Sequence, residues 1–482
     1  MPERFILGID QSTSGTKALL FNSAGELMGR CDRQHEQKIS PEGWISHDPM
    51  EIYRNTIAAA KDIFEKTGIN KSAVIGAAIS NQRETALAWD KKTGAPLCDA
   101  VVWQCSRASG ICARLKNYAD VINKKTGLKL SPYFSAAKIA WILEQTGRSD
   151  GIYAGTIDSW LVYKLTGNHK TDYSNASRTQ LFNINGLCWD IEICDIFGID
   201  PNILPEVCDS DALYGYTDFE AVLPDKIPIH AVLGDSHAAM FGHGCTQKGA
   251  GKITYGTGSS VMINIGESPV CYNEKLVTSL AWKLNGKINY VLEGNINYTG
   301  AVIKWLADDL GLIDSPKDAG IIAARANSAD TTYLVPAFSG LGAPYWNNEA
   351  RAIFCGMSRN TRKAELVKAA EECIAYQITD VIKEAEITAP IKITDLHVDG
   401  GSCADEFLMQ FQSDICGISV IVPKTEEISG MGAAYAAGMT LGLYDDFVLI
   451  QKPEKVYNPN MSVDRRNIKY QGWLEAVKKS IN

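Results

Sequence analysis

Residues 8–17, Gly-Ile-Asp-Gln-Ser-Thr-Ser-Gly-Thr-Lys, stand between two short apolar runs at residues 5–7 and 18–21. Two strand-length runs joined by a Gly/Ser/Thr turn predict a β-hairpin whose tip presents backbone N–H groups, hydroxyls and one lysine. Such a tip can hold phosphate. Because a carboxylate beside phosphate is repulsive unless a divalent cation lies between them, we expect Asp10 on the side of a magnesium ion. An ordinary hairpin with a solvated turn is the alternative, since turns favour the same residues.

The same pattern returns in the second half of the chain. Residues 252–264 again read as strand, Gly/Thr/Ser turn and strand, and a glycine-rich stretch at 241–251 precedes them. We therefore expect a domain boundary near residue 246, with one domain over 1–246 and another over 247–482. Two phosphate-type hairpins, one opening each half, predict a duplicated nucleotide-binding architecture with ATP clamped between the halves.

Length and composition agree with a folded two-domain protein that binds a small ligand. The chain has 482 residues, more than one hydrophobic core usually serves, and 45% of them are hydrophobic. Its net charge of −9, without a basic stripe, argues against nucleic acid or an acidic membrane surface as partner. The 13 cysteines show no metal-ligand spacing, and there is no leader and no long apolar run, so we expect a reduced, cytoplasmic protein.

Two predicted strands end in charged residues. The apolar run at 74–79 leads to Arg83 and Glu84, and the run at 229–233 leads to Gly234 and Asp235. The carboxyl ends of buried strands are where open α/β sheets present ligand groups. For the first pair a strand-end salt bridge on the surface is the alternative, and for Asp235 the alternative is an ordinary helix N-cap.

Two other segments of the chain have recognisable patterns. A strand at residues 396–399 runs into Gly400 and Gly401, where glycines let the backbone approach a base or ribose closely. Residues 430–438 are rich in glycine and alanine and predict a helix that packs closely; we assign it no chemistry.

Together these pieces resemble the FGGY family of carbohydrate kinases, and within it the glycerol kinase branch. The matching residues are 8–16, 43–44, 47–52, 81–85, 102–105, 133–135, 172–173, 175–179, 255–258, 340–346 and 399–401. The resemblance covers nearly the whole chain. The fold it implies is α/β, with two actin-like, ribonuclease-H-like domains and a cleft between them that holds sugar and ATP.

The resemblance implies a role for each matching position. Asp235 looks like the general base, which accepts the proton of a terminal hydroxyl as that oxygen attacks the γ-phosphorus of ATP, and it stands with Asp10 near Mg2+. The ATP contacts implied are Thr13, Ser14 and Lys17 at the γ-phosphate, Thr257 and Gly258 at the transferring end, Gly300 and Lys304 at the phosphate or ribose, and Gly401 and Asp405 at the adenosine.

The acceptor pocket matches the branch only in part. Arg83, Glu84, Trp103, Tyr133 and Asp235 stand where glycerol kinases bind glycerol. This chain departs from the branch at four positions: Ser236, which His237 follows, replaces glutamine, Ser260 replaces an aromatic residue, Lys304 replaces glutamine and Asp405 replaces asparagine. Two small hydroxyl side chains predict a roomier, more polar pocket, so we expect a four- or five-carbon polyol or ketose to meet Ser236, His237 or Ser260. Glycerol is the alternative acceptor, and His237 is otherwise a packed helix residue.

Two other classes of protein share such a core. An actin-like or chaperone-like ATPase would need no acceptor residues, and a catalytically dead sensor would not need Asp10 and Asp235 together. The stretch at 218–226, where the branch carries a glycine- and arginine-rich regulatory loop, is acidic and apolar, so we expect no inhibition by fructose bisphosphate. A homo-oligomer, dimer or tetramer, stays open at this point.

Overall fold

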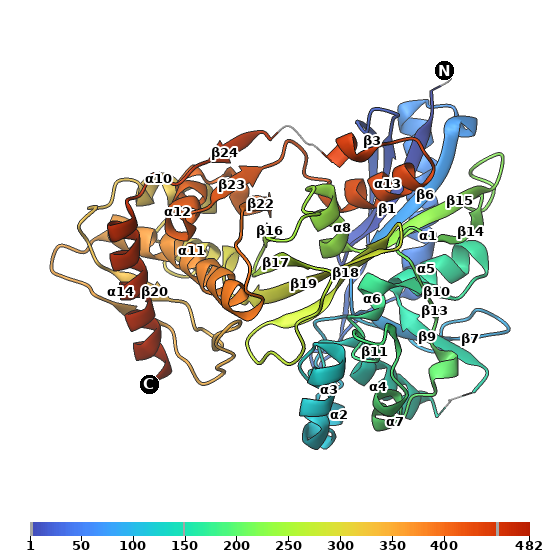
Figure 1. Cartoon of the computed structure of the whole chain (residues 1–482), viewed down its shortest axis with the longest axis horizontal. Coiled ribbons are helices and arrows are strands. Elements are labelled where there is room, and N and C mark those ends of the chain that lie inside the picture. The colour runs from blue at the N-terminus through green and yellow to red at the C-terminus, as the bar shows by residue number, and fades with distance from the viewer. Residues whose placement is uncertain (1–2, 148–149, 450–452) are drawn as a thin grey trace.

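The computed structural model describes residues 3–147, 150–449 and 453–482, and two large sheets organise them (Figure 1). The first sheet has six strands, in the spatial order β14 (Leu213–Thr217), β15 (Ile227–Gly234), β6 (Val74–Asn81), β1 (Phe5–Gln11), β2 (Gly15–Phe21) and β3 (Leu27–Gln34). The second has seven, in the order β18 (Val277–Leu284), β19 (Lys287–Ile296), β17 (Ser259–Gly266), β16 (Ala250–Tyr255), β22 (Asp395–Gly400), β23 (Ser419–Val422) and β24 (Lys455–Tyr457).

The two sheets repeat one arrangement. In each, a central strand, β1 or β16, pairs antiparallel with the strand that follows it, and on its other side lie two parallel strands, β6 and β15 or β22 and β23. Both predicted hairpins are confirmed: Asp10 lies opposite Lys17 in the first, and Tyr255 lies opposite Ser259 in the second. The duplicated ribonuclease-H-like fold expected from the sequence is therefore present.

Helices cover both faces of the first sheet, because its strands alternate apolar side chains to either side. Helix α1 (Pro49–Thr67) and helix α5 (Ile157–Thr166) pack on the face that carries Leu7 and Ile9. Helix α8 (Asp235–Gly242) and helix α13 (Ile428–Thr440) pack on the face that carries Ile6 and Leu19.

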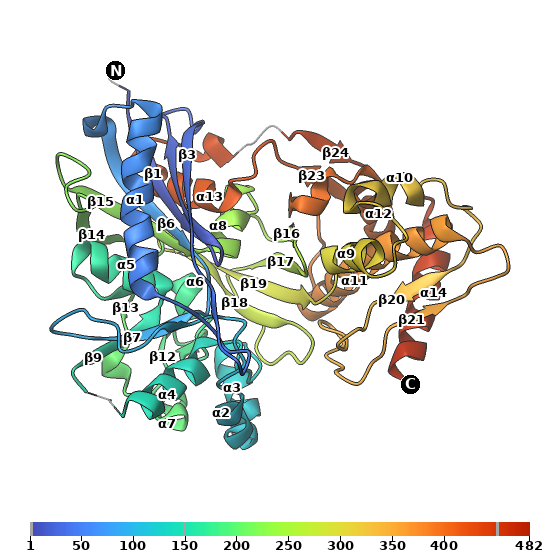
Figure 2. The same ribbon diagram turned by 180° about the vertical axis from the view of Figure 1, so that it is seen from behind.

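Helix α13 is the small-residue helix expected from the sequence, and it lies on the N-terminal sheet although it comes late in the chain (Figures 1 and 2). A Cβ on Gly432 would collide with the carbonyl oxygen of Ala238, and one on Gly8 would lie 3.2 Å from the carbonyl oxygen of Gly430. Glycines thus permit the close packing. Residue 246 lies in the connection between α8 and β16. The division into domains at 1–246 and 247–482 stays a prediction, and α13, which belongs to the second half of the chain, packs on the sheet of the first half.

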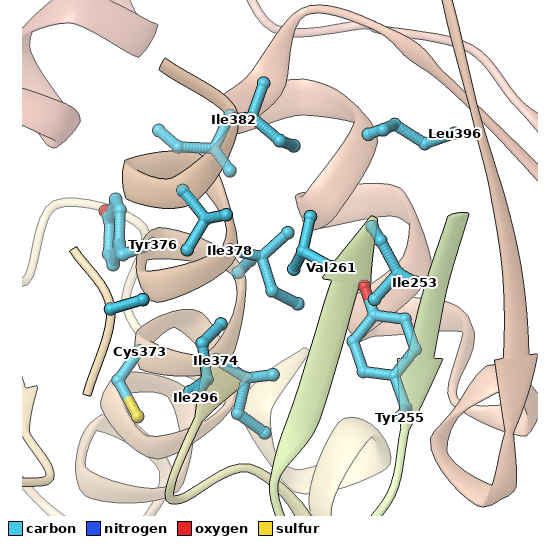
Figure 3. Packing of buried hydrophobic residues seen from close by; sticks show 14 of the residues in the cluster. Ile253, Tyr255, Val261, Ile296, Cys373, Ile374, Tyr376, Ile378, Ile382 and Leu396 are labelled. Atoms are coloured by element: carbon cyan, nitrogen blue, oxygen red, sulfur yellow. The ribbon is translucent and has the colours of Figure 1, made fainter. Parts of the chain in front are cut away.

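The second sheet packs against the longest helix, α11 (Lys363–Thr388). Ile374, Ile378 and Ile382 on α11 face Ile253 and Val261 of the strands (Figure 3). Further helices surround this layer: α9 (Gly300–Asp308), α10 (Ala319–Ala323), α12 (Glu406–Cys416) and α14 (Val463–Ile481). The opposite face of the sheet contributes Met262 and Val291 to the core that contains α8, which joins the two halves.

A third, five-stranded sheet belongs to the N-terminal half and extends below the first sheet in Figure 1. Its strands are β4 (Lys38–Ile39), β5 (Ile45–His47), β8 (Ala100–Val101), β7 (Ala86–Asp90) and β9 (Ile152–Thr156). The helices around it are α2 (Ser109–Arg114), α3 (Ala119–Thr126), α4 (Ser135–Thr146) and α7 (Ile191–Phe197). Helix α6 (Tyr173–Ala176) instead packs with the core of the second sheet. Three two-stranded sheets complete the fold: β10 (Lys170–Asp172) with β13 (Glu206–Cys208), β11 (Phe182–Asn183) with β12 (Cys188–Trp189), and β20 (Tyr333–Val335) with β21 (Ile353–Cys355). Among the described helices, none is both long and apolar enough to cross a membrane.

A buried carboxylate holds α14 on α11 and gives the fold a pH dependence. Asp380 accepts hydrogen bonds from Tyr470 Oη at 2.7 Å, Trp473 Nε1 at 2.8 Å and Tyr345 Oη at 3.0 Å. Burial raises the pKa of Asp380 to about 7, although these three donors act in the opposite direction. The carboxyl group of Asp380 therefore binds its proton more tightly in the native state than in the unfolded chain. The stability that this protonated group contributes is lost as the pH rises from about 4 to about 7.

We expect the Asp380→Asn variant to lack this loss. The free energy of unfolding of the wild type, taken relative to the variant, should fall by up to about 1.4 kcal/mol per pH unit across that window. Urea unfolding of both proteins between about pH 4.5 and pH 8 measures the difference. Parallel stability profiles for the two proteins would contradict the assignment.

Candidate active site

Two adjoining cavities lie at the hairpin tips. The first, of about 790 Å³, is lined by Thr13 of the first tip, Thr257 and Gly258 of the second, and Asp235. The second, of about 810 Å³, shares four lining residues with the first: Gly256, Thr257, Tyr298 and Ala301. The β16–β17 tip therefore stands between two spaces that together form one path along the cleft.

Arg83 and Glu84 follow strand β6 and both line the first cavity. Glu84 has a left-handed backbone, with φ of 62°, which is a strained conformation for a residue with a side chain and is typical of functional sites. Both side chains are buried, at 6% and 2% exposed. The surface salt bridge considered for this pair is therefore wrong.

The two residues are paired with partners from distant parts of the chain. Arg83 donates from Nη1 and Nη2 to the carboxylate of Glu293, at 3.1 Å each, and its Nε lies 3.3 Å from Asp235 Oδ1. Glu84 accepts a hydrogen bond from Arg178 Nε at 2.5 Å. The result is a cluster of two arginines and three carboxylates at the wall of the first cavity.

An aromatic wall completes this end of the first cavity. The rings of Trp103 and Tyr133 meet edge to face with their centroids 5.5 Å apart, and Trp103 Nε1 donates to Thr13 Oγ1 at 2.9 Å. The buried ammonium of Lys138 donates to the carbonyl oxygens of Pro132, Tyr133 and Phe134, which fixes the loop that carries Tyr133. Burial raises the pKa of Tyr133, so its ring presents a neutral hydroxyl.

Asp235 is the first residue of α8, and its side chain is 34% exposed toward the first cavity. The N-cap of this helix is Gly234, so the interpretation of Asp235 as an ordinary N-cap is wrong. Its Oδ1 accepts the N–H of Ser236 at 2.6 Å. The carboxylate is thus fixed from two sides, by Ser236 and Arg83, and still reaches the open space.

The departures from the branch pattern have different outcomes. Ser236 and Ser260 line the first cavity, as expected, and Ser260 Oγ donates to Glu293 Oε1 at 3.2 Å. His237 does not line it: the side chain is fully buried, Nε2 lies 3.4 Å from Ser279 Oγ, and burial holds the pKa of His237 well below its usual value. The expected contact of His237 with substrate is corrected, because one step along α8 turns the side chain into the core.

The expected phosphate contacts at the first hairpin separate into two groups. Thr13 lines the first cavity, and Ser14 stands beside it at the tip, with Oγ 3.3 Å from Ser12 Oγ. Lys17 lines neither cavity, because its Nζ donates to Glu427 Oε2 at 2.8 Å, at the start of α13. Glu427 also pairs with Arg30.

The second cavity contains most of the remaining nucleotide positions. Gly300, Lys304 and Gly401 line it, together with Trp305. A Cβ on Gly300 would lie 2.6 Å from the carbonyl oxygen of Gly256, so glycine keeps the helix start against the hairpin tip. Lys304 is exposed and lies 3.8 Å from Asp308.

Asp405, expected at the adenosine, does not line this cavity. Its Oδ1 accepts the N–H of Leu408 at 3.0 Å and caps α12, while the carboxylate lies against Gly320 and faces a separate space with Phe407. The expectation for Asp405 is thus corrected to a helix cap, and an asparagine or an aspartate serves that purpose equally well.

Asp10, the carboxylate expected near a divalent cation, lines neither cavity and lies buried near the end of β1. It is 6% exposed, its nearest cation, Lys17 Nζ, is 3.9 Å away, and Asp235 adds like charge. Burial raises the pKa of Asp10 to about 6. Within residues 3–147, 150–449 and 453–482, no three His, Cys, Asp or Glu side chains converge as a metal site, so phosphate oxygens and water would have to complete the coordination.

Sequence reasoning missed two buried charged residues that lie behind the wall of the first cavity and contact Arg83 or Glu84. Glu293 lies within the apolar strand β19, and a lone carboxylate there was a usable signal. Arg178 stood inside a matching motif but received no role. Asn295, near the end of the same strand, and Asn297, just after it, also line the first cavity without having been predicted.

Comparison with known proteins adds independent findings. The model of the N-terminal domain of the FGGY family of carbohydrate kinases matches residues 5–242, and the model of the family's C-terminal domain matches residues 251–441. Glycerol kinase 1 of Thermotoga maritima is 45% identical to the chain, over 98% of this chain and 99% of that protein.

Solved structures agree with the fold. The crystal structure of Plasmodium falciparum glycerol kinase with ADP matches with a TM-score of 0.94 at 33% identity, covering 99% of this chain and 98% of the other. A ligand-bound xylulose kinase from Lactobacillus acidophilus matches with a TM-score of 0.88 at 21% identity, covering 99% and 97%, and so shares the fold.

Proposed function

Because the chain belongs to the FGGY family of carbohydrate kinases and is an ATP-dependent kinase, we propose that it transfers the γ-phosphoryl group of ATP to a terminal hydroxyl of glycerol, forming glycerol 3-phosphate. The glycerol kinase of T. maritima is 45% identical along nearly the whole length, which favours glycerol among the polyols. A small polyol or sugar is the only partner that the proposal requires. We also propose that the protein acts in the cytoplasm. That it forms a homo-oligomer stays a prediction.

The observation that carries the proposal is that the proton acceptor Asp235, the acceptor-binding residue Arg83 and the β16–β17 tip all lie at the first cavity. The carboxylate of Asp235 reaches the first cavity 3.3 Å from Arg83 Nε, and the same cavity is lined by the β16–β17 tip. A hydroxyl bound there is close both to a proton acceptor and to the tip that would present phosphate. Such positioning supplies much of the rate in phosphoryl transfer.

The roles follow from the chemistry of each side chain. Asp235 accepts the proton of the terminal hydroxyl as its oxygen attacks the γ-phosphorus, because that proton becomes acidic only as the new bond forms. Arg83 donates to, and Glu84 accepts from, the neighbouring hydroxyls. Trp103 and Tyr133 pack against the carbon chain and exclude water, which would otherwise compete as acceptor.

The nucleotide would extend from the first cavity into the second. Thr257 and Gly258 offer backbone N–H groups and a hydroxyl at the transferring end, and Thr13 lines the same cavity. The N–H of Gly300 is donated to the carbonyl oxygen of Gly256 at 3.0 Å, so Gly300 serves only as a close-packed position beside the nucleotide. Asp10, whose pKa is raised by burial and in part by the like charge of Asp235, would hold a magnesium ion beside that end, with Asp235 as the second carboxylate. When bound, the ion supplies neutralisation of phosphate charge.

A four- or five-carbon acceptor is the second candidate, favoured by Ser236 and Ser260. Both are small and both line the first cavity, which leaves space and hydroxyl groups at one end. The bond from Ser260 to Glu293 occupies one of these groups and weakens this candidate.

Coupled ADP release with glycerol, erythritol, threitol, erythrulose, ribitol, xylulose and ribulose decides between the two acceptor classes. We expect the highest kcat/KM with glycerol. A tenfold or greater preference for a longer acceptor, about 1.4 kcal/mol of transition-state binding, would favour the second candidate.

The double variant Ser236→Gln/Ser260→Phe should narrow the acceptor range. Larger side chains at these two wall positions fill the space beyond a three-carbon chain, so kcat/KM for the five-carbon acceptors should fall by tenfold or more while that for glycerol changes less than about threefold, since one methylene is worth about 1–3 kcal/mol in such pockets. The double variant Ser236→Ala/Ser260→Ala is the matched control. Equal losses for all acceptors would show that neither residue bounds the acceptor.

A further inference from the structure

Glu293 is a fully buried carboxylate that belongs to neither cavity but contacts residues that do. It lies in β19, in the second half of the chain, and its side chain is 0% exposed. Its oxygens accept two hydrogen bonds from Arg83, and its Oε2 lies 2.8 Å from Arg178 Nη1. Although burial alone would raise it, the pKa of Glu293 is held well below its usual value by Arg178 and Arg83.

The carboxylate has an electrostatic reason to be there. Arg83 and Arg178 are both buried and repel each other, so an anion between them offsets the cost that two unpaired buried charges would carry. Glu84 neutralises Arg178 from the other side at 2.5 Å. Glu293 is the anion that touches both guanidinium groups.

The geometry fixes what Arg83 can still do. A guanidinium has five N–H donors in a rigid plane. Two of them, on Nη1 and Nη2, go to Glu293, and Nε faces Asp235 at 3.3 Å. Two N–H groups are left, and since Arg83 lines the first cavity they are the ones available to an acceptor.

We propose that Glu293 is a positioning residue for the acceptor: it sets the plane of Arg83, so that one edge of the guanidinium aligns Asp235 and the free N–H groups bind acceptor hydroxyls. This rests on the proposed function. Ser260 lines the first cavity and donates to Glu293 Oε1 at 3.2 Å, but the two charged contacts with Arg83 set the position of the guanidinium. Glu293 itself does not touch the acceptor.

The test is the Glu293→Gln variant, which keeps the shape but turns an NH2 group toward a guanidinium. We expect the KM for glycerol to rise by about thirtyfold or more while the KM for ATP stays within about twofold, because Arg83 does not line the second cavity. Glu293→Asp, which keeps the charge but draws it back by one methylene, should give an intermediate KM for glycerol.

A double-mutant cycle separates positioning from general damage. In an Arg83→Lys background, where the planar fork is already lost, Glu293→Gln should add less than about threefold to the KM for glycerol. Asp380→Asn is the matched control: it also removes a buried carboxylate, lines neither cavity, and should leave the KM for glycerol unchanged.

Each outcome has a separate meaning. A wild type that phosphorylates no polyol overturns the proposed function and this inference with it. A competent wild type whose Glu293→Gln variant keeps the glycerol KM, or raises both KM values in parallel, overturns the inference alone. If Glu293→Gln does not fold, Glu293→Asp with an unchanged glycerol KM overturns it as well.

Discussion

Replacing Asp235 by asparagine should lower kcat for glycerol phosphorylation by about a thousandfold, the range typical of a lost general base. The amide keeps the size of the side chain and can still contact Arg83 and Ser236, but it cannot accept the proton of the attacking hydroxyl. The binding of ATP should stay within about twofold. Steady-state kinetics and isothermal titration with a non-hydrolysable ATP analogue measure the two quantities.

Asp225→Asn, on an exposed loop, is the matched control for this change and should have wild-type kinetics. Turnover by Asp235→Asn within tenfold of the wild type would mean that another group takes the proton. The same result would remove the reason for placing the acceptor at this helix start.

Replacing Arg83 by glutamine should affect both activity and stability. Two charge-assisted hydrogen bonds to acceptor hydroxyls, at about 1.5–3 kcal/mol each, amount to a loss of about a hundredfold or more in kcat/KM for glycerol. Glu293 would keep only Arg178 as a cationic partner, and breaking a buried pair by removing one partner costs about 3 kcal/mol in the free energy of unfolding.

The double variant Arg83→Gln/Glu293→Gln tests the electrostatic part of this prediction. Because it removes both charges of the pair, it should be more stable in urea unfolding than Arg83→Gln alone, while its kcat/KM for glycerol stays as low as that of Arg83→Gln. Arg83→Lys keeps the charge but loses the planar fork, so it should retain most of the stability and little of the activity. A double variant less stable than the single one would contradict the pairing.

The fold was open to prediction because its signals are local. Each hairpin consists of consecutive residues, and the apolar runs around Asp10 and Thr257 set the strands without help from distant contacts. The glycine and alanine content of residues 430–438 likewise predicted a closely packed helix. Its place on the N-terminal sheet was not predictable, because only the third dimension brings Gly432 against Ala238.

Site residues were predictable where a motif lies at the end of a strand. They were not predictable where the direction of the side chain decides whether a residue lines the cavity. Arg83, Glu84, Trp103, Tyr133 and Asp235 all line the first cavity, as expected. The prediction for His237 was wrong because adjacent helix positions point about 100° apart, so the residue next to a site residue can point into the core instead of the cavity.

Asp405 and Glu293 depend on contacts across the chain. An aspartate that caps a helix and an aspartate that binds a ligand look the same in a sequence. Only the hydrogen bond from the N–H of Leu408 identifies Asp405 as a cap. Glu293 is 210 residues from Arg83 in the chain, a pairing for which one sequence contains no signal beyond a charge in an apolar strand.

The most direct test of the central claim is phosphorus NMR of the product formed from ATP and glycerol by the purified protein with magnesium. We expect one phosphate ester signal split into a triplet by the two hydrogens of a primary carbon, growing in step with ADP and absent with Asp235→Asn. Inorganic phosphate released in step with ADP, with no ester signal from glycerol or any longer polyol, would instead indicate an ATPase without a small-molecule acceptor and would contradict the account.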